Sequence, residues 1–179
     1  MKNILVLISL ISAMASAQTC QELYEQHLKT DMSLSYKEFD QTMGKGFREL
    51  IREDLSCDKE AALLIEEYIK VNNATESSLR WHAAQSWANF GDYQKSIKWS
   101  KTVLLENEDF SQRELRWNDF VLANIAFFEK DKEQLLKRRD VIAAAKDKHF
   151  GNQLNLKYLN SLITHFDKPF KYAMQNITE

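Results

Sequence analysis

The sequence is poor in the two residues that most often interrupt helices. Its 179 residues include only 4 glycines and 1 proline, whereas average usage would give roughly 12 and 9. β-Sandwiches, barrels and other turn-rich architectures depend on glycine and proline at their many turns. The deficit therefore argues against them and favours a chain of α-helices.

Long hydrophobic runs are also missing, apart from a short one near the N-terminus. This run, Ile4 to Ile11, follows Lys2 and precedes Ala15-Ser16-Ala17, a small-x-small pattern of the kind that signal peptidase cleaves. It is too short to cross a bilayer, which takes about 20 residues. Residues 1–17 are predicted to be a signal peptide cleaved near Ala17. The mature chain, residues 18–179, is then expected to be exported to the periplasm or secreted, without a membrane span.

The chain has no excess of charge of either sign. Its 24 basic and 26 acidic residues give a formal net charge of −2. Capture of nucleic acid or of an anionic lipid surface depends on a clear positive excess. Neither kind of partner is predicted.

Cysteine is scarce, and the two that occur are Cys20 and Cys57. An even number of cysteines in an exported protein favours a disulfide. The bridge would tie the mature N-terminus to the beginning of a later helix. The alternative is a pair of buried free thiols.

No set of residues has the spacing of a catalytic or metal-binding motif. The four histidines are His27, His82, His149 and His165. No two of them are four residues apart, and none has a carboxylate at a spacing typical of metal ligands. The protein is therefore predicted to be non-catalytic, with no metal and no cofactor.

The clearest pattern lies in Ser78 to Leu105. Small and apolar residues recur there at steps of three and four on both sides of Gly91-Asp92, which indicates two amphipathic helices. These residues are Leu79, Ala83, Ser86, Trp87 and Phe90 before the turn, and Tyr93, Ile97, Ser100 and Leu104 after it. Glycine ends helices in the left-handed conformation and aspartate caps the next helix, so an αα-hairpin is predicted.

This hairpin resembles the tetratricopeptide repeat. The matching positions are the small Ala84, the aromatic Trp87, the turn Gly91-Asp92-Tyr93, and Ser96-Ile97 where alanine and an aliphatic residue are usual. The proline that commonly closes the repeat is replaced by Asn107-Glu108-Asp109.

A second copy follows after 39 residues. At this shift Lys130-Asp131 corresponds to Gly91-Asp92, Ala123 to Ala84, Phe120 to Trp81, and Leu136 to Ile97. Ser111 and Glu114 have the spacing of a capping box and are predicted to open its first helix, which continues through Trp117, Val121, Ile125 and Phe128.

Helical patterns also flank these two copies. Ser35 and Glu38 form a possible capping box for a helix with Phe39, Met43, Phe47, Leu50 and Ile51 on one face. Asp58 is predicted to cap the next helix, and together the two would form a degenerate hairpin. A last apolar helix runs from Asn152 to Phe166, and Phe170 to Met174 is predicted to form a final short helical turn. The expected fold is all-α: one domain of about three degenerate antiparallel hairpins with a C-terminal packing helix.

The resemblance implies a concave groove lined by the first helix of each hairpin. It places Trp81, Gln85, Trp117, Phe120, Asn124 and Phe127 in this groove. A groove that grips the C-terminal carboxylate of a peptide would need Lys or Arg together with Asn at such positions, and only Asn124 is suitable. An apolar or extended peptide is the better match, because aromatic faces bury large areas. The alternative is that the C-terminal helix covers these rings and they form the core.

Two non-catalytic functions fit these features. The first is an exported, tetratricopeptide-like module that binds a protein or peptide partner or acts as a scaffold. The second is a periplasmic inhibitor or immunity-type protein that blocks a toxin or hydrolase, because its size, export and lack of catalytic residues fit equally well. An enzyme is the least favoured class.

Overall fold

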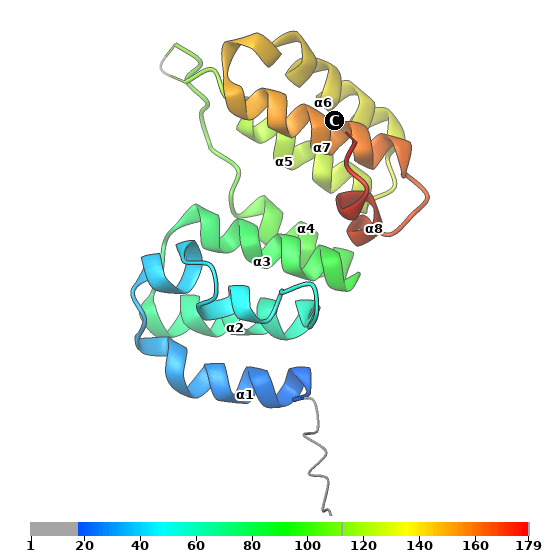
Figure 1. Cartoon of the computed structure of the whole chain (residues 1–179). Coiled ribbons are helices and arrows are strands. Elements are labelled where there is room, and N and C mark those ends of the chain that lie inside the picture. The colour runs from blue at the N-terminus through cyan, green and yellow to red at the C-terminus, as the bar shows by residue number, and fades with distance from the viewer. Residues whose placement is uncertain (1–17, 112, 179) are drawn as a thin grey trace, which may run out of the picture.

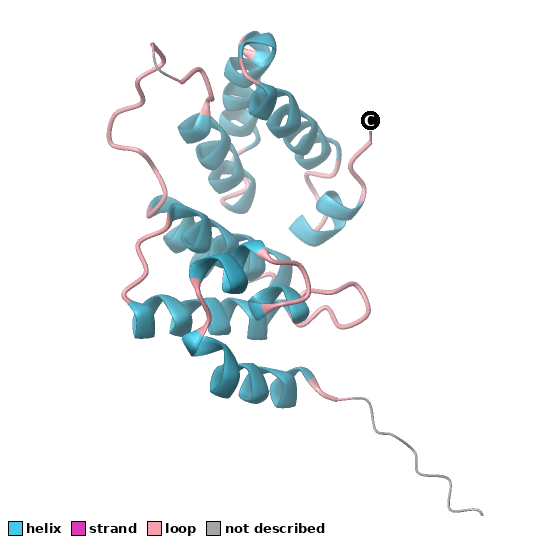
Figure 2. Cartoon of the chain, turned by 60° about the vertical axis from the view of Figure 1, so that its left-hand side comes forward, coloured by secondary structure: helices cyan, strands magenta, loops and turns pink. Residues whose placement is uncertain are grey.

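The computed structural model describes residues 18–111 and 113–178, and every regular element in these ranges is a helix (Figure 2). The all-α fold class is thereby confirmed. The predicted signal peptide lies outside the described residues. Across the described ranges, no helix combines the length and apolar character that crossing a membrane requires.

The helices pack on their neighbours in chain order in two groups joined by the long connection between α4 and α5 (Figure 1). The first group holds α1 (Cys20–Thr30), the short turns η1 (Asp31–Ser33), η2 (Lys37–Gln41) and η3 (Gly46–Glu49), and then α2 (Asp58–Asn72), α3 (Ser77–Phe90) and α4 (Tyr93–Lys101). The second holds α5 (Trp117–Phe128), α6 (Lys132–Ala144), η4 (Lys146–Lys148), α7 (Phe150–Thr164) and α8 (Phe170–Gln175).

The hairpins α3–α4 and α5–α6 have the same turn. Gly91 and Lys130 both adopt left-handed backbone conformations, with φ of 99° and 61°. Asp92 and Asp131 each accept a hydrogen bond from the backbone N–H three residues on, at 3.1 and 3.0 Å. Each also donates its own N–H to the carbonyl five residues back, at 2.9 and 2.8 Å. The two turns therefore correspond at the shift of 39 residues.

The residues on which the repeat was predicted pack inside these hairpins. Ala84, Trp87, Ile97 and Ala123 are all buried. Ser96 donates its hydroxyl to the carbonyl of Ala84 at 2.8 Å, which holds α4 close to α3. Phe90 was expected on the same inner face as Trp87, but it is 53% exposed because it ends α3 at the turn.

The continuous helix predicted from Ser35 to Ile51 is wrong. Its capping box does form, since the N–H of Glu38 bonds Oγ of Ser35 at 3.3 Å and the N–H of Ser35 bonds Oε2 of Glu38 at 3.2 Å. The chain then makes the π-helical turn η2, an irregular turn and the 3₁₀ turn η3. Gly44 and Gly46 adopt φ of 72° and 55°, values that an α-helix excludes.

Gly46 is needed there because a Cβ would collide with the backbone of Phe39. The break turns Met43 outward, and its side chain is 79% exposed instead of buried. The first predicted hairpin therefore lacks a complete first helix.

Two helix starts in the structure also differ from those predicted. Ser111 and Glu114 form no capping box, because the N–H and hydroxyl of Ser111 both bond Oδ1 of Asp109, at 2.9 and 2.6 Å. Such local side-chain bonds compete with helix formation, and α5 begins only at Trp117. Asp58 is the first residue of α2 and not its cap, since its carboxylate pairs with Lys171.

Helix α3 lies between two hydrophobic clusters and contributes to both. Leu79 and Ala83 join the N-terminal cluster with residues of η2, η3 and α2. Trp81, Ala84 and Ala88 join the C-terminal cluster with residues of α5 to α8. Its remaining face carries the site described below.

A disulfide joins Cys20, the first residue of α1, to Cys57, the residue before α2. The Cα atoms of the two cysteines are 5.4 Å apart, and Cys57 is buried. The bond ties the first helix to the body of the domain.

Candidate functional site

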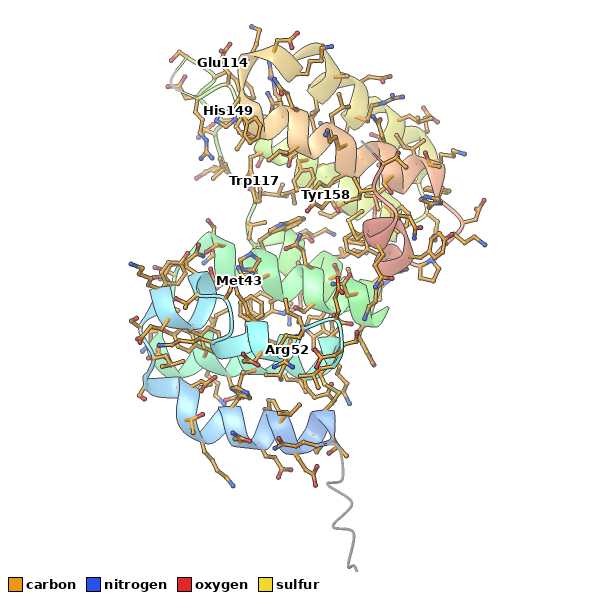
Figure 3. All side chains as sticks on the ribbon, viewed as in Figure 1. Met43, Arg52, Glu114, Trp117, His149 and Tyr158 are labelled. Atoms are coloured by element: carbon orange, nitrogen blue, oxygen red, sulfur yellow. A yellow bond between two sulfur atoms is a disulfide. The ribbon has the colours of Figure 1, made fainter. Side chains whose placement is uncertain are left out.

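The central pocket is a hollow of about 240 Å³ between η3, α3, α7 and α8. Its polar lining consists of Arg48, His82, Gln85, Ser86, Asn89 and Tyr158. Its apolar lining consists of Phe47, Ile51, Phe170 and Met174. Tyr158 lies on the side of the C-terminal helices that faces α3 (Figure 3). The pocket thus brings together segments more than 100 positions apart in the sequence.

Asp40 and His82 form a buried pair behind the pocket. The carboxylate of Asp40 is fully buried, and its Oδ1 lies 2.5 Å from Nδ1 of His82. Its other oxygen accepts a hydrogen bond from the Gln41 side-chain amide. Because a carboxylate only accepts, Nδ1 of His82 is the donor, which fixes the orientation of the ring.

Arg48 is held on the same wall by two contacts. Its Nε donates to the backbone carbonyl of Asp40 at 2.5 Å, and the guanidinium carbon lies 5.0 Å from the centre of the Phe47 ring. Across the described residues, its terminal nitrogens have no hydrogen-bond partner and no carboxylate within ion-pair distance. The guanidinium is thereby positioned, with two of its three nitrogens available.

The lining of the central pocket contains no carboxylate. Two acidic side chains lie in an adjoining side pocket of about 200 Å³, which shares Ile51, Asn89 and Met174 with it. There Asp58 pairs with Lys171, while Glu53 lies at the exposed end. The side pocket thus holds two carboxylates and one ammonium group, and we refer to the two adjoining hollows together as the groove along α3.

Helix α8 forms the wall of this groove opposite η3. The N–H of Phe170 donates to the hydroxyl of Tyr93 at 2.9 Å, and the hydroxyl of Ser161 donates to the carbonyl of Ala173 at 2.6 Å. Phe170 and Ala173 are the buried residues of this helix. These contacts fix a helix of only 6 residues.

The aromatic residues predicted to line an open groove lie mostly in the core. Trp81 is 8% exposed, Phe120 5%, Asn124 3% and Phe127 0%. The Phe120 ring centre is 6.4 Å from that of Tyr158 in α7. The Phe127 ring is covered by Phe166 and by Phe170 of α8, with centres 5.8 and 6.1 Å away.

Gln85 is the one predicted groove residue that lines the central pocket. Trp81 and Trp117 meet edge to face at 5.5 Å and border a different hollow of about 210 Å³, next to Arg113 and Leu105. Trp117 is visible at this position on the side of α5 that faces α3 (Figure 3). The six residues therefore do not form one continuous surface.

Sequence reasoning named His82 only among the histidines without a metal-binding spacing, and it did not single out Asp40 or Arg48. Asp40 and His82 are 42 positions apart, and no periodic pattern connects them. The only related signal is the pair of glycines at 44 and 46, whose left-handed conformations turn the chain so that Asp40 and Arg48 lie together.

Among the residues that the structure describes, the pocket has no ligand set for a metal and no hydroxyl bonded to its histidine. In the part of the chain that the structure describes, no group of three or more His, Cys, Asp and Glu side chains could hold a metal ion. Asp40 is the only hydrogen-bond partner of the His82 side chain among these residues. Ser86 lines the same pocket without bonding the imidazole. The geometry suits binding through donors and an apolar floor.

Tyr68 of α2 packs against η2, the segment that contains Asp40. Burial raises the pKa of the Tyr68 hydroxyl. The negative charges of Glu76, Asp40 and Glu38 add to this effect. The Tyr68 hydroxyl donates to the carbonyl of Leu34 at 2.7 Å, and its ring stacks on Phe39 at 3.8 Å. The neutral phenol is therefore the form that holds η2 against α2.

Comparison of the chain with family models, with curated proteins and with solved structures finds no match. The resemblance to the tetratricopeptide repeat stays a prediction from the residues that carry it.

Proposed function

We propose that this protein is an exported, non-catalytic binding module of tetratricopeptide-like hairpins that holds a segment of a partner protein in the groove along α3. The groove is the observation that supports this proposal, because polar side chains converge there and some of their hydrogen-bonding groups have no partner within the described residues. Arg48 has free terminal nitrogens there, and Gln85 and Asn89 lie along the same helix face.

The shape of the groove supports a polypeptide ligand. The central and side pockets, of about 240 and 200 Å³, share Ile51, Asn89 and Met174 in their linings. Each is smaller than the roughly 300–1,000 Å³ typical of small-molecule sites. A chain of linked small pockets is suited to successive side chains of an extended segment.

The repeated turns support the tetratricopeptide-like part of the proposal. Gly91 and Lys130 adopt the same left-handed conformation, and Asp92 and Asp131 cap the following helices in the same way. Successive hairpins of this kind place their first helices along one inner face, and α3 is the first helix of its hairpin.

Selection of peptides from a random library tests the proposal. The purified protein is expected to enrich a peptide family that binds it. Substitution of Gln85→Ala together with Tyr158→Ala removes two partly exposed groove side chains and is expected to weaken these peptides tenfold or more. Trp81 and Phe120 are unsuitable for this test, since they lie in the core.

The matched control is Lys137→Ala with Gln153→Ala, at two exposed positions outside the groove. It is expected to bind as the unchanged protein does. Failure to enrich any peptide, or equal binding by the groove variant, would overturn the proposal. Co-purification of a hydrolase that loses activity on binding would favour the inhibitor alternative.

A further inference from the structure

The central pocket combines one positioned cation with an apolar floor and has no acid in its lining. We propose that it receives the carboxylate side chain of a glutamate or aspartate from the partner protein, with Arg48 as the ion-pair partner. This inference rests on the proposed function and specifies what the groove recognises.

The first step of the argument is the state of Arg48. The hydrogen bond from Nε to the Asp40 carbonyl and the contact with the Phe47 ring fix the plane of the guanidinium. A guanidinium is always charged and presents its donors in a fork that matches a carboxylate. A fork that is already oriented loses little side-chain entropy on binding.

The second step is the environment of that fork. The groups that face the central pocket from α3 and α7 are His82, Gln85, Ser86, Asn89 and Tyr158. Gln85, Ser86, Asn89 and Tyr158 each carry an N–H or O–H that can donate, whereas the Nδ1–H of His82 already bonds Asp40, and none of the five is an acid. Asp40, the nearest carboxylate on this wall, is fully buried and bonded to His82 and Gln41. An incoming carboxylate would therefore meet donors, and no carboxylate of the lining would repel it.

The third step is size and polarity. A pocket of about 240 Å³ holds a single side chain more readily than a whole ligand. Phe47, Ile51, Phe170 and Met174 surround the space that the methylene groups of glutamate would occupy. Apolar walls also strengthen an ion pair by lowering the local dielectric. The glutamate side chain, which is one methylene longer than that of aspartate, can therefore contact the apolar walls while its carboxylate pairs with Arg48.

The test titrates the isotope-labelled protein with three probes and follows side-chain NMR signals of Arg48 and Gln85. The probes are the blocked peptide Ac-Ala-Glu-Ala-NH2, its glutamine counterpart Ac-Ala-Gln-Ala-NH2, and propionate. The glutamate peptide is expected to bind at least tenfold more tightly than the glutamine peptide. Arg48→Gln is expected to remove this preference.

Two further variants keep the result interpretable. Arg52→Gln alters an exposed arginine that pairs with Glu49 and Asp54 outside the pocket, and it should leave binding unchanged. Gln85→Glu places a carboxylate inside the pocket and should weaken the glutamate peptide tenfold, even where Arg48→Gln disturbs folding.

Three results would overturn the inference: equal binding of the two peptides, an undiminished preference in Arg48→Gln, or propionate binding more tightly than the glutamate peptide. The last would identify a free organic acid as the ligand. Failure of this inference can be told apart from failure of the proposed function. Library peptides that depend on Gln85 and Tyr158 but contain no acidic residue would support the proposed function and contradict the inference.

Discussion

Nζ of Lys171 lies 2.5 Å from Oδ2 of Asp58, across 113 positions of the chain. The Asp58 side chain is only 8% exposed and that of Lys171 is 31% exposed. The pair joins the short helix α8 to the first turn of α2, directly after Cys57 of the disulfide. It lies in the lining of the side pocket and ties the α8 wall of the groove to α2.

Loss of this pair should destabilise the fold. Lys171→Ala leaves the carboxylate of Asp58 buried without its cation, and we expect a loss of about 1.5–3 kcal/mol in the free energy of unfolding. Lys168→Ala, at an exposed lysine three residues earlier, should change it by less than about 0.5 kcal/mol. Urea unfolding measures both. Equal stability of the two variants would show that the pair contributes nothing.

The disulfide should provide a larger part of the stability. It closes a loop between cysteines 37 positions apart, for which the loop-entropy model gives about 4 kcal/mol. Replacement of both cysteines by serine, or addition of a reductant, should lower the free energy of unfolding by up to this amount. The reductant should have no effect on the double-serine variant. An unchanged unfolding midpoint in the reduced protein would contradict the prediction.

Local patterns predicted much of the helical layout. Gly91-Asp92 and Lys130-Asp131 end one helix and start the next, because their backbone preferences and side-chain caps act within a few residues. The short final helix after Pro169 was also expected and is present as α8. Features determined by neighbours in sequence were thus accessible from sequence alone.

Features determined by tertiary contacts were not accessible from the sequence alone. The periodicity from Ser35 to Ile51 predicts one helix, yet Gly46 must approach the backbone of Phe39 and the helix is broken. The aromatic rings expected in a groove are covered by α7 and α8, whose position depends on contacts such as Phe170 to Tyr93. Asp40, which lies behind the central pocket, and His82 in its lining are 42 positions apart and meet through tertiary packing.

Low pH should remove a stabilising contribution of Glu38. A hydrogen bond from the Ser35 hydroxyl, with smaller contributions from the Ser35 N–H and Lys45, holds the pKa of Glu38 below its ordinary value of 4.5. Because the folded pKa is the lower one, the contribution is present above pH 4.5 and is lost as the pH falls through the folded pKa. Ser35→Ala should raise the pKa of Glu38 toward 4.5.

An NMR titration of the Glu38 side-chain carboxyl checks this prediction. Ser33→Ala serves as the control, since the Ser33 hydroxyl bonds the carbonyl of Thr30 and not Glu38. A Glu38 pKa that is the same in the unchanged protein and in Ser35→Ala would contradict the prediction.

Glu66 should be essential to the packing of α2 against the α3–α4 hairpin. Its Oε1 accepts hydrogen bonds from the indole N–H groups of both Trp87 and Trp99, each at 2.7 Å. Trp87 is 1% exposed, so water cannot readily replace the lost acceptor. Glu66→Ala should therefore lower the free energy of unfolding by about 2–3 kcal/mol and change the tryptophan fluorescence of the folded protein.

Two companion variants separate the hydrogen bonds from a general effect of charge on α2. Glu66→Gln keeps a side-chain oxygen and should lose only about 1 kcal/mol. Glu67→Ala removes a neighbouring carboxylate that meets Lys70 at the surface and should change stability by less than about 0.5 kcal/mol. If Glu66→Ala and Glu67→Ala proved equally stable, the shared acceptor would have no structural role, and the contact between α2 and the hairpin would depend on apolar packing alone.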